Sequence, residues 1–368
     1  MINSEDYTVK VQAERIENYG NDGWIPIRIK DKFDNGRYKI RNKLGFGSRA
    51  TVWVARDYEL DIAVSIKVFK AANSPDNREL RILQHIEQQS PDHPGREYLP
   101  KYLRHFNVHR NGKTNRFIVL ELLGPQLRQI HEQFHPYNPS FSRRVSKQLL
   151  LAIDCLHSYG IVHGDIHEGN VLFCLPGGYK MPLDKVSQGR VKRVDGAPLC
   201  ENLPSRLVEP LFNAIKDSDA ERFRNNSNIK LIDFSSSFFE FEAPEWIHTR
   251  SDIVSPEVIV QKPPTKAIDI WSLGCLTFYI ATGRRLLETI KGGPSILPQI
   301  YAVVGSSPAP LDDSEDYSDS EDYPDLEGLL DGVGISDQAL SQYIRKALVV
   351  DPVKRATTSG LRQQEFVQ

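Results

Sequence analysis

The spacing of apolar positions marks the first half of the chain as rich in strands. The stretches "ATVWVARD", "DIAVSIKVFK" and "RFIVLELLG" are built around β-branched and aromatic residues that alternate or form short apolar runs, as strands do. Between the last two, "DNRELRILQHIEQQ" carries Leu80, Leu83 and Ile86 at helical spacing. The pattern therefore predicts a small sheet with one helix, ending at the turn signal Gly124-Pro125.

After that turn signal the period changes to that of helices. The stretch "SRRVSKQLLLAIDCLHSYG" has Gly160 just past its end, where helices commonly stop. The positions that share one face of this helix are Val145, Leu149, Leu150, Ile153 and Leu156. We expect a mixed α+β protein with a small β-rich lobe, a hinge near residues 121–125 and a larger helical lobe.

Two stretches interrupt this pattern. Residues 174–228 are rich in Pro, Gly, Lys, Arg and Asn and are predicted to be a loop-like insert. Residues 305–328, "GSSPAPLDDSEDYSDSEDYPDLEG", are strongly acidic. Such a run is typical of a solvated loop, with a docking surface for a basic partner as the alternative. With these, the expected organisation has three parts: an N-terminal extension at 1–35, the small lobe at 36–124, and the large lobe at 125–368, which carries both the insert and the acidic loop.

Composition narrows the class of protein. The chain has 368 residues, 40% of them hydrophobic and 26% charged, with a formal net charge of −2. This near-neutral balance argues against a general nucleic-acid binder. The N-terminus lacks the pattern of a signal peptide, and no apolar stretch is long enough to cross a membrane. We expect a cytoplasmic or nuclear monomer without nucleic-acid or membrane partners. Its four scattered cysteines are expected to be reduced and buried: Cys155, Cys174, Cys200 and Cys275.

A glycine-containing turn and a lysine supply the first candidate chemistry. The stretch "LGFGSRATVWVA" has Gly45 and Gly47, with Ala50 where a third glycine would complete G-x-G-x-x-G. Glycines let a hairpin backbone lie close over phosphates. Lys67 follows on an apolar strand, where an ammonium needs an anionic partner, and Glu79 on the next helix can supply it. An edge-strand lysine pointing to solvent is the alternative.

The stretch "HGDIHEGN" at 163–170 supplies the second. Asp165 and Asn170 stand five residues apart, which can place a carboxylate beside a hydroxyl nucleophile and an amide oxygen on a hard metal ion. The same letters also fit an ordinary polar turn. Asp233 follows the apolar strand of "IKLIDF", and a carboxylate there suits Mg²⁺. In "SPEVI" and "DPVKRAT", Glu257 and Arg355 are candidates for a buried bidentate pair.

The order and spacing of these pieces, with "DIWSLGC", resemble the eukaryotic protein kinase family over about residues 36–367. The flanks "ENYGNDGWIPIRIKDKFDNGRYKIRNKLG" and "VLELLGPQL", with the insert before Asp233, resemble its serine/arginine-rich protein kinases, especially the fungal ones. The resemblance implies a two-lobed protein kinase fold and transfer of the ATP γ-phosphate to protein serine or threonine, in arginine/serine-rich segments for that subfamily.

The resemblance also implies roles for individual residues. Lys67, paired with Glu79, would hold the α- and β-phosphates, and Asp165 would accept or orient the substrate hydroxyl proton. Asn170 and Asp233 would bind Mg²⁺. The remaining nucleotide contacts would come from the glycine-rich loop (Leu44, Gly45, Phe46, Gly47), from Val52 and Leu172 around the adenine ring, and from the hinge backbone at Glu121 and Leu123.

Four departures from the family pattern bear on activity. Gly164 stands where many kinases have the arginine of H-R-D, and His167 stands where a lysine commonly touches the γ-phosphate. Ser235 replaces the glycine after Asp-Phe. In addition, "HTRSDIVSPE" has one residue more than the usual substrate-binding segment and lacks its tyrosine. A pseudokinase scaffold is therefore one alternative, and a small-molecule phosphotransferase of the aminoglycoside or choline kinase type, which shares H-G-D-x-H-x-x-N, is the other.

The glycine at position 164 leads to a prediction about regulation. The arginine of H-R-D usually receives the activation-loop phosphate, so a chain without it is expected to be active without that phosphorylation. Treatment of the purified protein with a phosphatase should leave its kinase activity unchanged, measured by phosphate transfer before and after treatment. Loss of activity after dephosphorylation would contradict the prediction.

Overall fold

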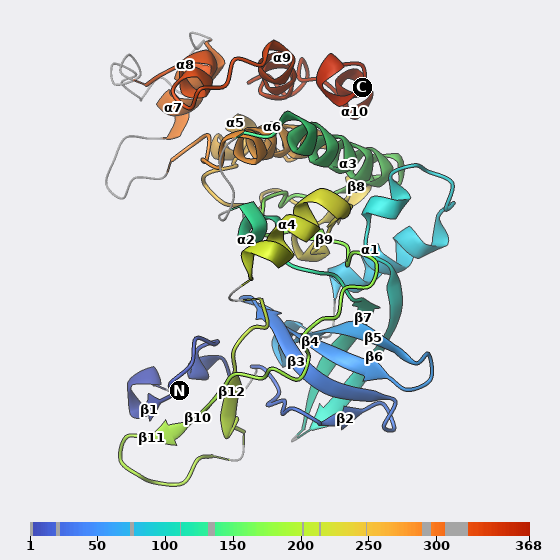
Figure 1. The fold of residues 1–368 in the computed structure, drawn as a ribbon, viewed down its shortest axis with the longest axis vertical. Coiled ribbons are helices and arrows are strands. Elements are labelled where there is room, and N and C mark those ends of the chain that lie inside the picture. Colours follow the sequence, from blue (N-terminus) through green and yellow to red (C-terminus); the bar gives the residue numbers. More distant parts are fainter. Residues whose placement is uncertain are drawn as a thin grey trace. The chain divides into compact units, whose positions relative to one another are not determined.

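The computed structural model describes residues 3–19, 23–73, 77–110, 112–131, 137–200, 202–212, 215–247, 249–288, 296–305 and 323–368. The chain divides into two compact units (Figure 1). The first comprises residues 1–80, 100–124 and 175–219, and the second comprises residues 81–99, 125–174 and 220–368. Most of the expected acidic loop at 305–328 lies outside the described residues, which resume at Tyr323.

The first unit is built on an antiparallel sheet with strand order β2-β3-β4-β5-β7-β6. Its strands are β2 (Lys32–Phe33), β3 (Tyr38–Phe46), β4 (Ala50–Asp57), β5 (Ile62–Phe69), β6 (Tyr102–Arg110) and β7 (Lys113–Glu121). Alternate residues of the central strands form an apolar core in which Ile40, Val64 and Ile66 are fully buried. The alternation of apolar and polar residues in the sequence of these strands thus corresponds to one buried face of the sheet.

The insert and the N-terminal extension pack together in this same unit. The extension contains the 3₁₀ turn η1 (Ser4–Asp6), β1 (Tyr7–Thr8) and the 3₁₀ turn η2 (Ile16–Tyr19). Outside the extension, another 3₁₀ turn, η3 (Ala71–Asn73), follows β5. The insert contributes β10 (Gln188–Arg190), β11 (Lys192–Arg193) and β12 (Arg206–Val208). Strand β1 pairs with β11, and β10 pairs with β12. The loop-like composition therefore conceals short strands, because strands of two or three residues are too short to show a period in the sequence.

The second unit is mainly helical. Its helices are α1 (Arg78–Gln88, which begins in the first unit), α2 (Leu127–His131), α3 (Pro139–Ser158), α4 (Asp217–Asn226), α5 (Pro256–Ile259), α6 (Ala267–Thr282), α7 (Ile296–Val304), α8 (Leu326–Asp331), α9 (Gln338–Ala347) and α10 (Thr358–Arg362), with 3₁₀ turns η4 (Arg96–Tyr98), η5 (Phe234–Ser236), η6 (Glu240–Glu242) and η8 (Glu365–Val367). The second unit also contains two short antiparallel strand pairs: β8 (Ile161–Val162) with β14 (Phe238–Phe239), and β9 (Val171–Phe173) with β13 (Ile229–Leu231).

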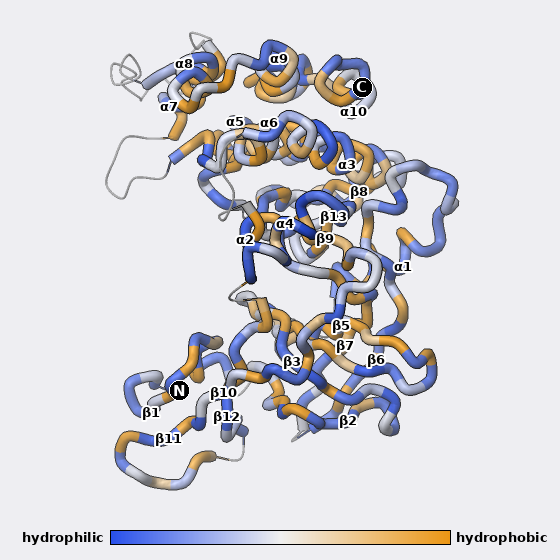
Figure 2. Tube along the Cα trace, in the orientation of Figure 1, coloured by the Kyte–Doolittle hydropathy of each residue, from blue (hydrophilic) through white to orange (hydrophobic). Residues whose placement is uncertain are grey.

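Helices α3 and α6 pack against each other. Local sequence signals explain where α3 begins and where α6 ends. The side chain of Asn138 caps α3 by accepting a hydrogen bond from the Phe141 N–H, and Pro139 occupies the first turn. Helix α6 ends at Gly283, whose φ of +72° is the left-handed cap conformation. Figure 2 shows hydrophobic residues gathered along α6, which is buried almost throughout, and hydrophilic residues along α4.

The expectation about the cysteines was correct only in part. All four cysteines are free, but only Cys155 and Cys275 are buried, whereas Cys174 is half-buried and Cys200 is exposed. The expectation of four buried thiols was therefore wrong for the two that lie at the edge of or within the insert, which has little core of its own. Among the described residues, no helix combines the length and the apolar character that crossing a bilayer requires.

Candidate active site

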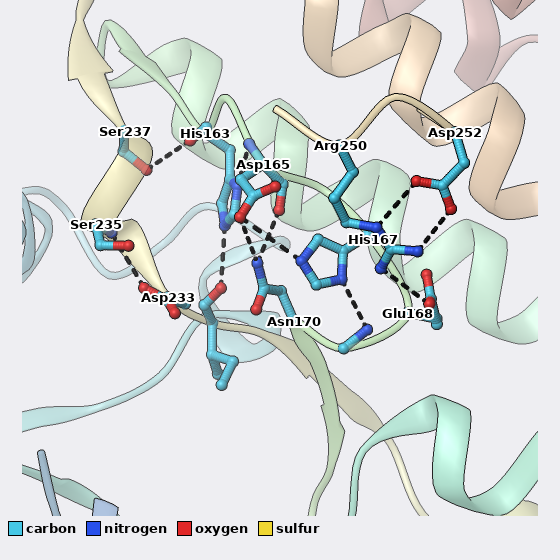
Figure 3. Close-up of polar contacts among 12 residues, drawn as sticks. His163, Asp165, His167, Glu168, Asn170, Asp233, Ser235, Ser237, Arg250 and Asp252 are labelled. Atoms are coloured by element: carbon cyan, nitrogen blue, oxygen red, sulfur yellow. Dashed lines mark hydrogen bonds and ion pairs between the residues drawn. The ribbon is translucent and has the colours of Figure 1, made fainter. Parts of the chain in front are cut away.

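The loop at 163–170 joins β8 to β9 and carries Asp165 and Asn170. Asp233 follows β13, the strand that pairs with β9. The Ile232 N–H donates to the Asn170 carbonyl over 2.9 Å, so the antiparallel pairing brings Asn170 next to the residue that precedes Asp233. The short strands thus gather three polar side chains from two segments of the chain, as Figure 3 shows.

The Asn170 amide fixes Asp165. Its Nδ2 donates to the Asp165 backbone carbonyl at 2.9 Å and to Asp165 Oδ2 at 3.3 Å. Since Nδ2 is used in this way, Oδ1 is the atom of Asn170 that remains to bind a cation. Asn170 is buried, and the Asp165 side chain keeps 23% of its surface exposed. The carboxylate is therefore both held in place and accessible to a substrate hydroxyl.

Asp233 stands in a strained turn. Its φ of +69° is in the left-handed region, which non-glycine residues rarely occupy. Its Oδ1 accepts the Ser235 N–H at 3.2 Å. Ser235 itself has no positive φ, so the serine that replaces glycine fits the described conformation without strain.

These oxygen ligands fit Mg²⁺. Mg²⁺ is usually bound through one or two carboxylates plus substrate phosphates, not by a cage made wholly of protein groups. Asp233 offers a carboxylate and Asn170 a carboxamide oxygen. The described residues contain no cluster of three or more His, Cys, Asp or Glu side chains suited to a metal.

A buried carboxylate on α6 anchors the Asp165 loop from behind. Asp269 is 1% exposed and accepts hydrogen bonds from the backbone N–H groups of His163 and Gly164, each at 2.8 Å. His157 Nε2 lies 2.9 Å from the same carboxylate. On the other side of the loop, the Ser237 hydroxyl donates to the His163 carbonyl at 2.9 Å. The backbone that leads into Asp165 is thus fixed by a charged acceptor and a neutral donor.

The two histidines that frame Asp165 are held differently. His163 is fully buried, and burial lowers its pKa and favours the neutral ring. Its Nδ1 accepts the Asp165 N–H at 3.3 Å, and its Nε2 donates to the Ile232 carbonyl at 3.1 Å. His167 Nδ1 accepts the Gly169 N–H at 3.0 Å, so the proton of the neutral ring lies on Nε2, 3.6 Å from Asp165 Oδ2.

A network of four charges lies beside the same loop. Arg250 donates to Glu168 at 3.0 Å and to both oxygens of Asp252 at 3.0 and 2.6 Å, as Figure 3 shows. Arg285 lies 2.9 Å from Asp252 and 3.5 Å from Glu168. Both carboxylates are buried, whereas the two arginines are partly exposed. The extra residue of "HTRSDIVSPE" thus lies in a segment that is tied firmly to the Asp165 loop.

The position of Gly164 requires a glycine. Its φ is +77°, and a Cβ there would lie 3.0 Å from the Ser236 carbonyl oxygen.

The segment after Asp233 is held by contacts that do not involve position 164. Strand β14 pairs with β8, and Arg81 on α1 binds both oxygens of Glu242 at 2.8 and 3.1 Å. The carboxylate of Glu242 thus places a negative charge beside Arg81 of α1 without phosphorylation.

The first unit carries the other predicted residues. Lys67 on β5 donates to both oxygens of Glu79 at 2.9 and 2.7 Å, and the two side chains are 12% and 3% exposed. The predicted ion pair is confirmed, and the solvent-facing alternative was wrong. Val52 lies directly opposite Lys67 in the sheet, so both side chains share one face.

The glycine-rich turn and the hinge also lie in this unit. Gly47 N–H donates to the Ala50 carbonyl at 2.9 Å to close the turn, and added Cβ atoms at Gly45 and Gly47 would meet nothing within 4 Å. Around them, Leu44 and Val52 are half-buried, and Phe46 is exposed. Leu172, half-buried on β9, belongs to the second unit.

In the hinge, the backbone N–H of Glu121 donates to the Lys101 carbonyl at 3.0 Å, and its side chain accepts the Lys101 N–H at 2.7 Å. Leu123 is buried, and its backbone makes no hydrogen bond to any other residue that the structure describes.

Asp269 and the Arg250 network were missed as parts of the site. The signal for Asp269 was present, because it is the one charged residue in the apolar stretch "AIDIWSLGCLTFYIAT", and a buried charge needs partners. Arg250, Glu168 and Asp252 gave no such signal, since charged residues in polar loops are ordinary. The buried Glu257–Arg355 pair was predicted, and it is confirmed at 2.7 and 2.8 Å.

The role of Asp269 can be tested without an activity assay. Asp269→Ala removes the acceptor of two buried N–H groups and is expected to lower the free energy of unfolding by about 3 kcal/mol or more. The amides of His163 and Gly164 should exchange with solvent faster, measured by hydrogen exchange. Asp331→Ala, at an exposed position of α8, is the control. Unchanged exchange at 163–164 would contradict the role.

Comparison with known proteins places the chain. The model of the family "Protein kinase domain" matches residues 38–181 and 220–367. A serine/threonine protein kinase of Aspergillus fumigatus is 27% identical over 320 residues, which cover 83% of this chain and 74% of that protein. Among solved structures, a crystallised kinase domain superimposes with a TM-score of 0.66 at 17% identity, over 94% of this chain and 99% of the other. This likeness confirms the expected α+β kinase fold.

Two further relatives match a shorter region. Protein kinase dsk1 of Schizosaccharomyces pombe is 35% identical over 175 residues, which are 45% of this chain and 32% of that protein. Human SRSF protein kinase 3 is 30% identical over 174 residues, 46% of this chain and 30% of that protein. The predicted resemblance to this group is therefore present in the sequence comparison. With the family model matching most of its length, the chain belongs to the protein kinase family.

Proposed function

We propose that this protein transfers the γ-phosphate of Mg·ATP to serines in arginine/serine-rich segments of other proteins. The coarser part of this statement follows from the family: the kinase domain and its named relatives make the chain an ATP-dependent protein serine/threonine kinase. The finer part, the metal and the substrate class, is the proposal. In it the β-rich residues 36–124 act as the small kinase lobe and residues 125–368 as the large lobe, in a monomer.

The observation that carries the proposal is the fixed position of Asp165. Its carboxylate is held by Asn170, and its backbone is held through Asp269. Phosphoryl transfer needs little covalent chemistry from the protein, so catalysis consists mainly of positioning and charge stabilisation. A pinned, partly exposed carboxylate suits the task of orienting a serine hydroxyl and accepting its proton.

The other side chains then bind and orient the nucleotide. Lys67, aligned by Glu79, would contact the α- and β-phosphates as a point charge. Asn170 and Asp233 would hold Mg²⁺, which neutralises phosphate charge when bound. Adenine would contact Leu44, Val52 and Leu172 and the backbone of Glu121 and Leu123, and the glycine-rich turn with Phe46 would cover the phosphates. His167 would offer the γ-phosphate one N–H where a lysine commonly offers a full charge.

Two observations support a basic substrate. The first is the similarity to SRSF protein kinase 3 and dsk1. The second is the stretch 240–245, in which Glu240, Glu242 and Glu245 are all exposed. Glu240 and Glu242 form ion pairs with Lys266 and Arg81, whereas Glu245 has no ion pair with any residue that the structure describes. Carboxylates at a surface attract arginine-rich segments by charge complementarity.

Replacing the proposed base separates binding from turnover. Asp165→Ala should lower kcat by about 10³-fold or more, because the oriented carboxylate acts in the transition state, while the affinity for Mg·ATP stays near that of the wild type. The measurements are a radiolabelled phosphate-transfer assay and calorimetric titration with Mg·ATP. Asp331→Ala serves as the exposed aspartate control. Full activity of Asp165→Ala, or no Mg·ATP binding by the wild type, would contradict the proposed function.

A peptide panel tests the substrate class. Peptides of alternating arginine and serine should be phosphorylated with a kcat/KM at least about tenfold above that of peptides in which glutamine replaces arginine, since the charge term is then lost. Small aminoalcohols and aminoglycosides complete the panel as substrates of the other phosphotransferase type. Equal rates on both peptide sets would overturn the arginine preference, and phosphorylation of only the small molecules would overturn a protein substrate.

A further inference from the structure

A buried ion pair lies directly before the glycine-rich loop. Lys43 on β3 contacts Glu14 of the N-terminal extension, and the Tyr19 hydroxyl donates to the other oxygen of the Glu14 carboxylate. The Lys43 and Glu14 side chains are 0% and 1% exposed. Burial of a lysine without a partner is costly, and removal of one member of a buried pair leaves an uncompensated charge. The pair therefore ties the extension to β3 at one defined point.

The ammonium of Lys43 also contacts the loop itself. It lies 5.5 Å from the ring centre of Phe46, in the glycine-rich loop, and 5.0 Å from that of Trp53 on β4. Both are within the range of cation–π attraction. The Trp53 indole N–H donates to the Thr51 hydroxyl at 2.9 Å, and Thr51 is paired with Phe46. One buried cation thus joins the strand before the loop, the strand after it and the aromatic side chain within it.

The strand is irregular at this point. The register of β3 against β4 shifts between Ile40 and Asn42 and again between Lys43 and Gly45. Asn42 and Lys43 are consecutive and both buried, which regular alternation of side chains would not allow. The two irregularities let the strand turn a charged side chain inward just before the glycines.

Lys43 acts from the face of the sheet opposite to the nucleotide residues. It is paired with Trp53, whereas Val52, the neighbour of Trp53, is paired with Lys67. Successive residues of a strand point to opposite faces. Glu14 and Lys43 therefore lie behind the residues proposed to bind ATP, and they have no direct contact with the nucleotide to offer.

The insert holds the same strand from further points. The Leu211 N–H donates to the Lys43 carbonyl at 2.8 Å, and the Asn42 amide donates to the carbonyls of Leu183 and Lys185 at 3.3 and 3.1 Å. The extension and the insert share an apolar cluster of Ile16, Tyr19, Trp24, Val191, Leu203 and Leu207. The residue that reaches Lys43 is thus carried on a small core made jointly by two segments outside the kinase-domain match.

We propose that Glu14 is a positioning residue for the glycine-rich loop, through which the extension and the insert set the affinity of the kinase for ATP. The inference rests on the proposed use of Mg·ATP but concerns Glu14, which lies outside the family match. Its mechanism is pre-organisation: a loop already held over its ligand loses less conformational freedom on binding. The extension and the insert together would be required for normal nucleotide affinity.

The test uses substitutions that preserve shape in the full chain. Glu14→Gln keeps the size of the side chain and leaves the Lys43 ammonium buried without a counter-charge. Lys43→Met keeps the aliphatic stem and removes the cation. The double variant Glu14→Gln/Lys43→Met leaves no unpaired charge. Arg15→Gln is the control, because Arg15 is the next residue and its side chain is 81% exposed.

Glu14→Gln is expected to raise both the KM for ATP and the Kd of a non-hydrolysable ATP analogue about tenfold, with kcat and the KM for the protein substrate changed by less than about twofold. Hydrogen exchange of residues 44–53 should become faster in the protein without nucleotide. The double variant should recover part of the loss, and Arg15→Gln should match the wild type. Should Glu14→Gln not fold, the double variant and Lys43→Met still give the comparison.

Two results would overturn the inference. One is wild-type ATP affinity and wild-type exchange at 44–53 in Glu14→Gln and Lys43→Met. The other is a general increase in exchange over the whole first unit with no selective effect on the loop, which is what a merely structural pair would give. Failure of the proposed function is distinguishable, because the exchange measurement needs no nucleotide and no activity.

Discussion

A carboxylate buried in the apolar helix α6 governs the geometry of the catalytic loop. Asp269 is buried there, and its side chain accepts the His163 and Gly164 N–H groups and contacts His157, which are the partners that a buried carboxyl group needs. Those two backbone groups cannot turn elsewhere without leaving a buried charge unpaired. The orientation of the following residue, Asp165, is thus a consequence of how α6 packs. The chemistry of the loop is linked to the stability of the helical unit.

Buried ion pairs fix the positions of side chains at three other places in this kinase. Glu79 fixes Lys67, Arg355 fixes Glu257, and Glu14 fixes Lys43, and in each pair both side chains are largely withdrawn from water. Such pairs contribute little net stability compared with apolar residues of the same shape, but breaking one is costly. Their value lies in geometry, because a buried carboxylate whose two oxygens both accept hydrogen bonds tolerates few alternative arrangements.

The sequence predicted an interaction only where both of the interacting residues could be recognised in it. Strands β4, β5 and β7 and helices α1 and α3 follow from periodicity, and the Lys67–Glu79 pair follows from the cost of a lysine on an apolar strand. Strand β6 of the same sheet was not predicted. The partners of Asp269 are backbone N–H groups, which every residue has, so its role leaves only the weak signal of one acid in an apolar helix. Strands β1 and β11 have two residues each and pair across distant segments, so no local pattern could reveal them. For the same reason, Lys43 gave no sign that Glu14 was its partner.

The departures from the family pattern become compatible with one another once their backbone angles are considered. The strained residue of the Asp-Phe-Ser turn is Asp233, not Ser235, so the loss of the glycine costs little there. The glycine instead appears at position 164, where φ is positive and a side chain would crowd the Ser236 carbonyl. Without an arginine at 164, the following segment is tied to α1 by Arg81 and Glu242 and to β8 by strand pairing. The partial exposure of both side chains, 47% and 41%, makes the ion pair alone a weak restraint, so the β14–β8 ladder must carry most of that order.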